Sequence, residues 1–213
     1  MRFNRTTVML AGIAAGIAAT PGPSASAYAA TAAPPASAPA LHPAMRKLWS
    51  DHVFWTRLYI VAAAAGDPSA QQASVRLLKN QEDIGNAIVP YYGAAAGSKL
   101  TDLLKQHILI AVDLVTAAKA GDAAKQADAD KRWHANAEDI AEFLGKANPN
   151  WTKAGLQSML NNHLALTTRE AVDRLKSNWT DDVQAFDAIY DQAMMMADAL
   201  SDGIAKQFPT KVS

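Results

Sequence analysis

The sequence predicts an all-α protein, an up-and-down bundle of six helices built from three helical-hairpin repeats. Apolar residues recur at helical spacing over long segments, as in the stripe that contains Leu100, Leu103, Leu104, Leu114 and Val115. Glycine, proline and asparagine interrupt these segments repeatedly. No segment has the alternating apolar and polar pattern that indicates a half-buried strand.

The first 27 residues have the organisation of a secretory signal peptide. Arg2 and Arg5 precede an apolar run over residues 8–19, and small residues suitable for cleavage follow. Residues 28–42 are rich in alanine, proline and serine, so we expect a flexible tether there. The apolar run is too short for a comfortable membrane span, so we expect a secreted or periplasmic protein without a permanent membrane anchor. An uncleaved anchor is the alternative.

Residues 43–210 are expected to form one bundle domain with a sizeable core, because long amphipathic segments begin there. Gly66 is expected to end the first helix, Pro90 to break the second and Gly121 to end the third. Thr152 is expected to cap the N-terminus of the fifth helix, because a threonine hydroxyl can accept a hydrogen bond from a free backbone N–H. The six helices are expected near residues 43–65, 68–89, 98–120, 123–146, 153–176 and 180–207.

Composition excludes several classes of protein. The chain has 20 basic and 20 acidic side chains, and this zero net charge argues against a partner that is a nucleic acid. It has no cysteine, which excludes disulfides, thiol catalysis and thiolate metal sites. Any bound metal ion would therefore need histidine, carboxylate, amide or methionine ligands.

The chain resembles itself at offsets of about 55 residues, which predicts an internal repeat. One offset aligns the segment around His52 with the segment around His107, and the next aligns His107 with His163. Asp83 precedes His107 by 24 residues, and Asp139 precedes His163 by the same number. Gene duplication would explain this repeat without any function attached to it.

The repeated polar residues are the candidate site. Helices rise about 1.5 Å per residue, so distance from each turn places His52, His107 and His163 at one level of the bundle. Asp83 and Asp139 fall at nearly the same level, on the edge of the inner stripe of their helices. These five residues are predicted to bind a metal ion or a small ligand in the bundle core. The ligand types suit Fe, Mn, Cu, Ni or Zn, and the sequence does not choose among them.

Two other functions are consistent with the same residues. The first is a structural or interaction module, in which buried hydrogen bonds between histidine and aspartate or asparagine only set the helix register. The second is a hydrolase or oxidase, in which Asp83 and Asp139 act as acid and base. The oligomeric state stays open.

Two segments carry a resemblance to known proteins. Residues 51–57 (Asp-His-Val-Phe-Trp-Thr-Arg) and 80–86 (Asn-Gln-Glu-Asp-Ile-Gly-Asn) resemble a poorly characterised family of exported bacterial all-α proteins. The resemblance implies an exported helical protein and no particular activity. The chain is only loosely similar in architecture to ferritin-like metal-carrying bundles, because it lacks the Glu-x-x-His motif that their di-metal sites use.

Overall fold

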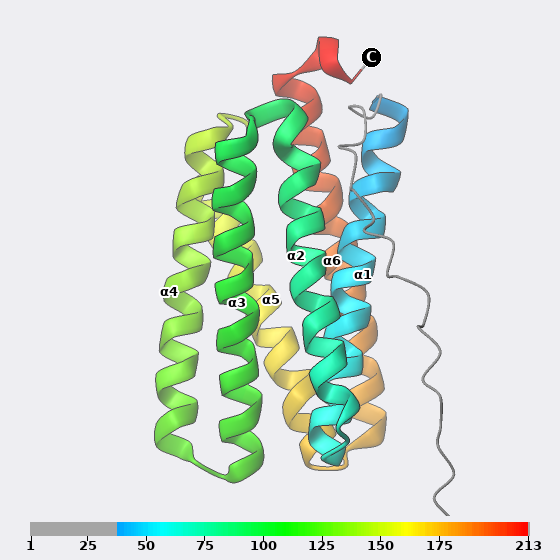
Figure 1. Ribbon diagram of the computed structural model, residues 1–213, viewed down its shortest axis with the longest axis vertical. Helices are drawn as coiled ribbons and strands as arrows, with labels where there is room; N and C mark the ends of the chain where they lie inside the picture. The colour runs from blue at the N-terminus through cyan, green and yellow to red at the C-terminus, as the bar shows by residue number, and fades with distance from the viewer. Residues whose placement is uncertain (1–37, 213) are drawn as a thin grey trace, which may run out of the picture. The chain divides into compact units, whose positions relative to one another are not determined.

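The computed structural model describes residues 38–212 and confirms an all-α up-and-down bundle of six helices, with no strand in that part of the chain (Figure 1). None of these helices combines the length and hydropathy that a membrane span requires. The expected signal peptide (1–27) and most of the expected tether (28–42) lie outside the described residues. The elements are α1 (Ala38–Ala65), α2 (Ser69–Tyr92), α3 (Ala94–Ala120), α4 (Ala123–Ala147), α5 (Lys153–Leu175), α6 (Trp179–Gln207) and the short 3₁₀ helix η1 (Pro209–Lys211).

The helices form a closed bundle with the odd-numbered helices at its centre. Each helix packs against the next one in the chain, and α6 packs back against α1. In addition, α1, α3 and α5 contact one another. Figure 1 shows α5 running obliquely behind α3 and α2, whereas α3 and α4 lie nearly parallel. A side chain that points inward from the middle of α1, α3 or α5 therefore reaches the centre of the bundle.

Large apolar side chains from all the helices fill the interior. Trp49, Ile84, Leu104, Trp133 and Leu164 belong to one cluster and come from five successive helices. Each is at most 5% exposed. Full burial of an aliphatic side chain of this size contributes about 1.5–3 kcal/mol, so the inner stripes read from the sequence provide most of the driving force for this packing.

Local side-chain chemistry sets several helix ends, at Gly121 and Thr152 as predicted and also at Asp122. The Asp122 carboxylate accepts a hydrogen bond from the Lys125 backbone N–H at 3.1 Å, which caps α4. The Thr152 hydroxyl accepts from the Gly155 N–H at 3.1 Å and caps α5. Gly121 ends α3 with a φ of 67°, a left-handed conformation that glycine adopts without steric cost.

Three predicted helix boundaries are wrong. The helix α3 begins at Ala94 and not near residue 98, and at the other two boundaries tertiary packing outweighs the proline signal. The helix α1 begins at Ala38, before Pro43, because Leu41 is buried in the core and extends the amphipathic stripe upstream. The helix α2 continues through Pro90 and ends only at Gly93, where φ is 85°. Its last turn is held by Tyr92, whose hydroxyl donates to the side chain of Gln207 at 2.8 Å. The bundle therefore includes residues 38–42, which the sequence assigned to the tether.

Candidate functional site

The structure brings three of the five predicted site residues together at the centre of the bundle. His52, His107 and His163 lie near the middles of α1, α3 and α5, and each is at most 4% exposed. The ring centroids of His52 and His163 are 5.7 Å apart, and those of His107 and His163 are 6.3 Å apart. The equal heights estimated from the sequence hold because all three helices run in the same direction.

A side-chain amide on the following helix holds the Nδ1 atom of two of these rings. The His107 Nδ1 lies 2.8 Å from the Asn136 Oδ1, and the His163 Nδ1 lies 3.0 Å from the Gln192 Oε1. An amide oxygen only accepts, so each Nδ1 carries the proton and donates it. Each Nε2 is then left with its lone pair, on the ring edge that faces away from the amide.

The same two amides also hold the backbone of the histidine-bearing helix. The Asn136 Nδ2 donates to the Leu103 carbonyl at 3.1 Å, and the Gln192 Nε2 donates to the Met159 carbonyl at 3.0 Å. Each of these carbonyls precedes its histidine by one helical turn. The amide therefore fixes both the ring orientation and the height of one helix against the next.

The first hairpin repeats this arrangement with a different tautomer. The Gln81 Nε2 lies 3.2 Å from the His52 Nδ1, and the same amide nitrogen donates to the Leu77 carbonyl at 2.8 Å. Because an amide nitrogen only donates, the His52 Nδ1 accepts and the ring proton is on Nε2. The Gln81 Oε1 is buried and has no hydrogen-bond partner among the described residues. The neighbouring Asn80 donates to the Leu48 carbonyl at 3.0 Å, one turn before His52.

The three rings share a cavity of about 30 Å³ with mostly apolar walls. The two threonine hydroxyls that line the cavity already donate hydrogen bonds to backbone carbonyls. Thr56 donates to the His52 carbonyl at 2.7 Å, and Thr167 donates to the His163 carbonyl at 2.9 Å. A buried water needs about 10–15 Å³ of such space, so the cavity holds about two water-sized groups. Its other lining residues include Tyr59, Leu77, Ile108, Val115 and Trp133.

Burial keeps all three histidines neutral at physiological pH. Burial lowers the pKa of His107 to about 3 and lowers the pKa of His163 below its ordinary value. The pKa of His52 falls well below its ordinary value through burial and through the proximity of the other two rings. No carboxylate lines the cavity to offset this effect. The site therefore presents neutral imidazoles, the protonation state in which histidine binds metal ions.

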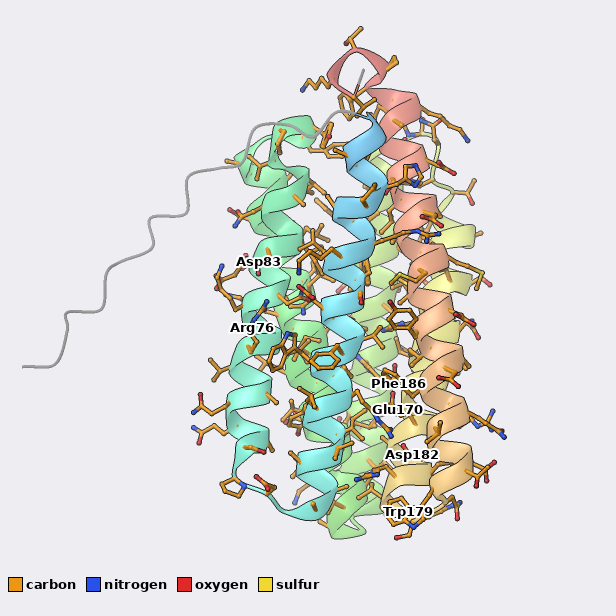
Figure 2. The ribbon with its side chains drawn as sticks, turned by 90° about the vertical axis from the view of Figure 1, so that its right-hand side faces the viewer. Arg76, Asp83, Glu170, Trp179, Asp182 and Phe186 are labelled. Atoms are coloured by element: carbon orange, nitrogen blue, oxygen red, sulfur yellow. The ribbon has the colours of Figure 1, made fainter. Side chains whose placement is uncertain are left out.

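The other two predicted site residues, Asp83 and Asp139, do not join the histidines. The Asp83 side chain is 34% exposed and pairs with Lys79 at 3.0 Å, and Arg76 lies on the same flank of α2 (Figure 2). Asp139 lies on the exposed side of α4. Neither aspartate lines the histidine cavity. Within residues 38–212, no three His, Cys, Asp or Glu side chains are arranged to hold a metal ion as they stand.

The amides that take the place of the aspartates carry a signal in the sequence. Gln81, Asn136 and Gln192 each follow the histidine that they contact by 29 residues. In the third hairpin the nearest counterpart of Asp83 and Asp139 in the sequence is Asp198, which lies a similar distance before the Pro209 break. Asp198 is partly exposed and accepts a hydrogen bond from Arg46 at 2.7 Å. A search for any amide at a fixed distance after each histidine would have found all three partners.

A buried ion-pair network lies beside the histidine cavity, and sequence reasoning missed it. Arg57 contacts the carboxylates of Glu170 at 3.1 Å and Asp182 at 2.8 Å, and Arg174 contacts Asp182 at 3.3 Å. The side chains of Glu170 and Asp182 are each 1% exposed. Figure 2 shows Glu170 and Asp182 close together near the lower part of α1 and α6. Asp182 lies in the first turn of α6, so it also meets the positive end of the helix dipole.

Glu170 of this ion-pair network and two of the histidines border a second, smaller cavity. That cavity has a volume of about 10 Å³ and is bounded by Glu170 together with His52, His163, Thr56 and Thr167. Burial raises the pKa of Glu170 to about 7, against the opposing charge of Arg57. Burial also opposes ionisation of Asp182, yet its bonds to Arg57 and Arg174 keep its pKa below the ordinary value.

No family model, curated protein or solved structure matches this chain. The resemblance of residues 51–57 and 80–86 to exported bacterial proteins therefore stays a prediction. The function is inferred from the chemistry of the histidine cavity.

Proposed function

We propose that this protein, after export, binds one divalent transition-metal ion through the Nε2 atoms of His52, His107 and His163. The observation that supports this most directly is that a side-chain amide contacts the Nδ1 of each ring, and that the three rings line one cavity. Metal-binding histidines are commonly arranged in this way, with one ring nitrogen on the ion and the other in a hydrogen bond that fixes the ring.

The neutral protonation state of the three imidazole rings favours the binding of a metal ion. A metal ion competes with protons for imidazole nitrogens, so a ligand that is already neutral binds without releasing a proton. Burial lowers the pKa of all three histidines, and His107 has a pKa of about 3. The lone pairs are therefore available throughout the physiological pH range.

Binding requires a small inward movement of the rings. Zinc–nitrogen distances of about 2.0–2.1 Å correspond to imidazole centroids about 5–5.5 Å apart. The centroid distances of 5.7 Å for His52 and His163 and of 6.3 Å for His107 and His163 exceed that range. These two pairs must close by up to about 1 Å, and His52 and His107 must come within the same range of each other. Rotation of the side chains into the shared cavity of about 30 Å³ provides that movement.

Binding also requires His52 to change its tautomer. When Nε2 holds an ion, the ring proton moves to Nδ1, which then needs an acceptor. Rotation of the Gln81 amide by half a turn brings its oxygen to that position, and it gives up the bond that the amide nitrogen donates to the Leu77 carbonyl at 2.8 Å. This oxygen is buried without a partner among the described residues, so it gains a hydrogen bond that it lacks in the metal-free protein.

The ligand set narrows the choice of ion. Three imidazoles without a carboxylate or thiolate suit Zn, Cu or Ni better than Mn, Mg or Ca, which prefer oxygen ligands. Three histidines leave a fourth position open on a tetrahedral ion. In zinc sites of this composition the open position binds a water whose pKa is lowered to about 7.

Fixing the helix register is a second candidate function for the same residues. The observation that favours it is the double contact of each amide, which binds a ring and also the carbonyl of Leu103 or Met159 on the same helix. These contacts need no ion. The hydrolase or oxidase function has less support, because Asp83 and Asp139, its expected acid and base, lie on the outer side of α2 and α4.

A metal titration tests the proposal. Metal-free protein, purified without a histidine tag, is mixed with Zn²⁺, Co²⁺, Ni²⁺ or Cu²⁺, and the bound ion is counted by mass spectrometry after gel filtration. We expect one ion per chain and a higher melting temperature, since an ion at 100 times its Kd adds about 2.7 kcal/mol to the free energy of unfolding. His163→Gln should abolish binding. His134→Gln, at an exposed histidine of α4, should leave it unchanged.

A third variant separates the two functions. His107→Gln disturbs the hydrogen bond to Asn136 and should lower the free energy of unfolding by about 1–3 kcal/mol in either case. Under the metal proposal it should also abolish ion binding. If the wild-type chain binds none of the four ions and its melting temperature does not move, the metal proposal is wrong and the register function stands.

A further inference from the structure

An apolar cavity of about 40 Å³ lies beside the histidine cavity and is lined by residues of the helices α1 to α6. Trp49, Leu104 and Leu160 belong to its lining, and each precedes the buried histidine of its own helix by three residues. A helical turn has about 3.6 residues, so the two cavities are about one turn apart along α1, α3 and α5. The proposed metal binding uses the histidine cavity and leaves the apolar cavity without a function.

The walls of the apolar cavity do not suit water. Its lining consists of aliphatic, methionine and tryptophan side chains, and no polar atom of the described residues is exposed on its wall. The Trp151 indole N–H donates to the Ala199 carbonyl at 3.2 Å, and the unpartnered Trp49 indole nitrogen is not exposed to the cavity. A buried water needs about two to four polar partners, whereas an apolar molecule restores the dispersion contacts that the lining atoms lack. The chemistry of the cavity therefore selects an apolar ligand.

The volume of the apolar cavity limits the size of that ligand. A water-sized group needs about 10–15 Å³ by the same measure, so about 40 Å³ admits about three non-hydrogen atoms. Met45, Met159 and Met196 line the cavity, and their unbranched side chains adapt to the shape of a guest. Because the affinity per atom has an upper limit, we expect a Kd of about 1 mM or weaker for a ligand of this size.

A surface hollow of about 380 Å³ shares part of its wall with the apolar cavity. Trp151, Leu156 and Met159 border both of them. Trp151 is fixed by its bond to the Ala199 carbonyl, and its ring packs directly against Gly203, where a Cβ would not fit. Leu156 is 3% exposed, whereas Met159 is partly exposed and has a flexible side chain that makes no hydrogen bond. Met159 is therefore the part of this shared wall that rotates aside most easily.

We propose that the apolar cavity binds one small apolar molecule of about three non-hydrogen atoms, which enters from the surface hollow past Met159. A dissolved apolar gas or a small hydrocarbon such as cyclopropane has the required chemistry. The site is independent of the proposed metal binding, since its lining contains none of the three histidines. Xenon is a suitable probe, because it is apolar, inert and known to enter dry cavities in proteins.

Isoleucine methyl spectra of the metal-free wild-type chain under xenon pressure test the site without any variant. Ile84, Ile140 and Ile204 line the apolar cavity, whereas Ile60 and Ile108 line the histidine cavity. We expect xenon to shift the methyl resonances of the first group saturably and to leave those of the second group in place. The absence of a saturable shift in the first group, or larger shifts in the second, overturns the inference and leaves the metal proposal untouched.

Filling each cavity in turn provides a matched pair of variants. Leu200 lines the apolar cavity, Leu114 lines the histidine cavity, and both side chains are buried. Leu200→Phe adds carbon atoms inside the apolar cavity, so it should weaken xenon binding about tenfold or more. Leu114→Phe should leave the xenon affinity equal to that of the wild type. Equal xenon affinity in the wild type and a folded Leu200→Phe protein overturns the inference.

The rate of xenon exchange tests the entry route. Met159→Ala should speed up exchange about tenfold, because it removes the flexible side chain between the apolar cavity and the surface hollow. Met45→Ala is the matched control, since Met45 also lines the cavity but is 2% exposed and does not border the hollow. Saturation transfer of hyperpolarised ¹²⁹Xe measures both rates. Faster exchange in Met159→Ala than in Met45→Ala supports the route, and equal rates in the two variants overturn it.

Discussion

Acidification of the metal-free protein from pH 7 to pH 5.5 should lower its free energy of unfolding by about 2–2.5 kcal/mol. This is the net of about 4 kcal/mol lost through three buried histidines and about 1.5 kcal/mol gained as Glu170, whose pKa is raised to about 7, takes up a proton in the folded state. The histidines of the unfolded chain take up protons below pH 6.5, whereas His52, His107 and His163 stay neutral in the bundle because their pKa values are lowered by burial. The unfolded state then binds more protons, so stability falls as the pH falls. Each histidine contributes up to about 1.4 kcal/mol per pH unit below 6.5. Urea titrations at four pH values measure this slope.

Two variants locate the origin of the slope. His107→Gln should make the slope smaller by up to about 1.4 kcal/mol per pH unit below pH 6.5, because one of the three buried rings is gone. His134→Gln, at an exposed ring, should leave the slope as it is. A slope that His107→Gln leaves unchanged would contradict the burial of a neutral imidazole at that position, because the contribution of Glu170 is the same in both chains.

Arg57→Met should cost about 3–5 kcal/mol of stability at pH 7, the typical effect of removing one partner from a buried ion pair. Arg57 contacts Glu170 at 3.1 Å and Asp182 at 2.8 Å, and both side chains are 1% exposed. Without the guanidinium, two buried carboxylates lie close together with only Arg174 to compensate them. Urea unfolding of wild type and variant at pH 7 measures the loss.

A surface ion pair of similar composition provides the control. Arg46 binds Asp198 at 2.7 Å, but the Arg46 side chain is 53% exposed, so Arg46→Met should change stability little. A loss from Arg57→Met no larger than the loss from Arg46→Met would mean that water replaces the guanidinium. The network beside the histidine cavity would then be solvated in solution.

Most of the fold could be predicted because its signals are local. Helical spacing of apolar residues and the cap at Thr152 depend on neighbours within a few residues, and the structure has them as expected. The errors at Pro43 and Pro90 arise where distant contacts decide. Burial of Leu41 and the bond from Tyr92 to Gln207 offset the lost backbone hydrogen bonds, and neither contact is visible in a local window.

The sequence predicts the level of the candidate histidines along the bundle, but it predicts only partly which side chains point into the core. Residue counting placed the three histidines on one level, and their rings are neighbours in the bundle. It also placed Asp83 at that level, but Asp83 lies on the flank of α2, where Lys79 provides a partner. On a helix, a shift of one or two positions turns a side chain from the core to the surface. The inward positions of α2 belong to Asn80 and Gln81, which are fully buried.

The buried ion pairs show a different limit of sequence reasoning. Arg57, Glu170 and Asp182 come from three helices and share no spacing or motif. Asp182 also has an adequate local explanation at the start of α6, where an acidic residue meets the positive end of the helix dipole. Only the packing of α1 against α5 and α6 brings the three charges together.

The central claim is that three imidazoles meet one ion through Nε2 while their Nδ1 atoms stay bonded to amides. A long-range ¹H–¹⁵N spectrum of the imidazoles, recorded before and after one equivalent of Zn²⁺, tests it most directly. With zinc, His52, His107 and His163 should all carry the proton on Nδ1 with a shifted Nε2, while the resonances of His42 and His134 stay in place. Unchanged spectra of the three buried rings, or shifts confined to His42 and His134, would contradict it.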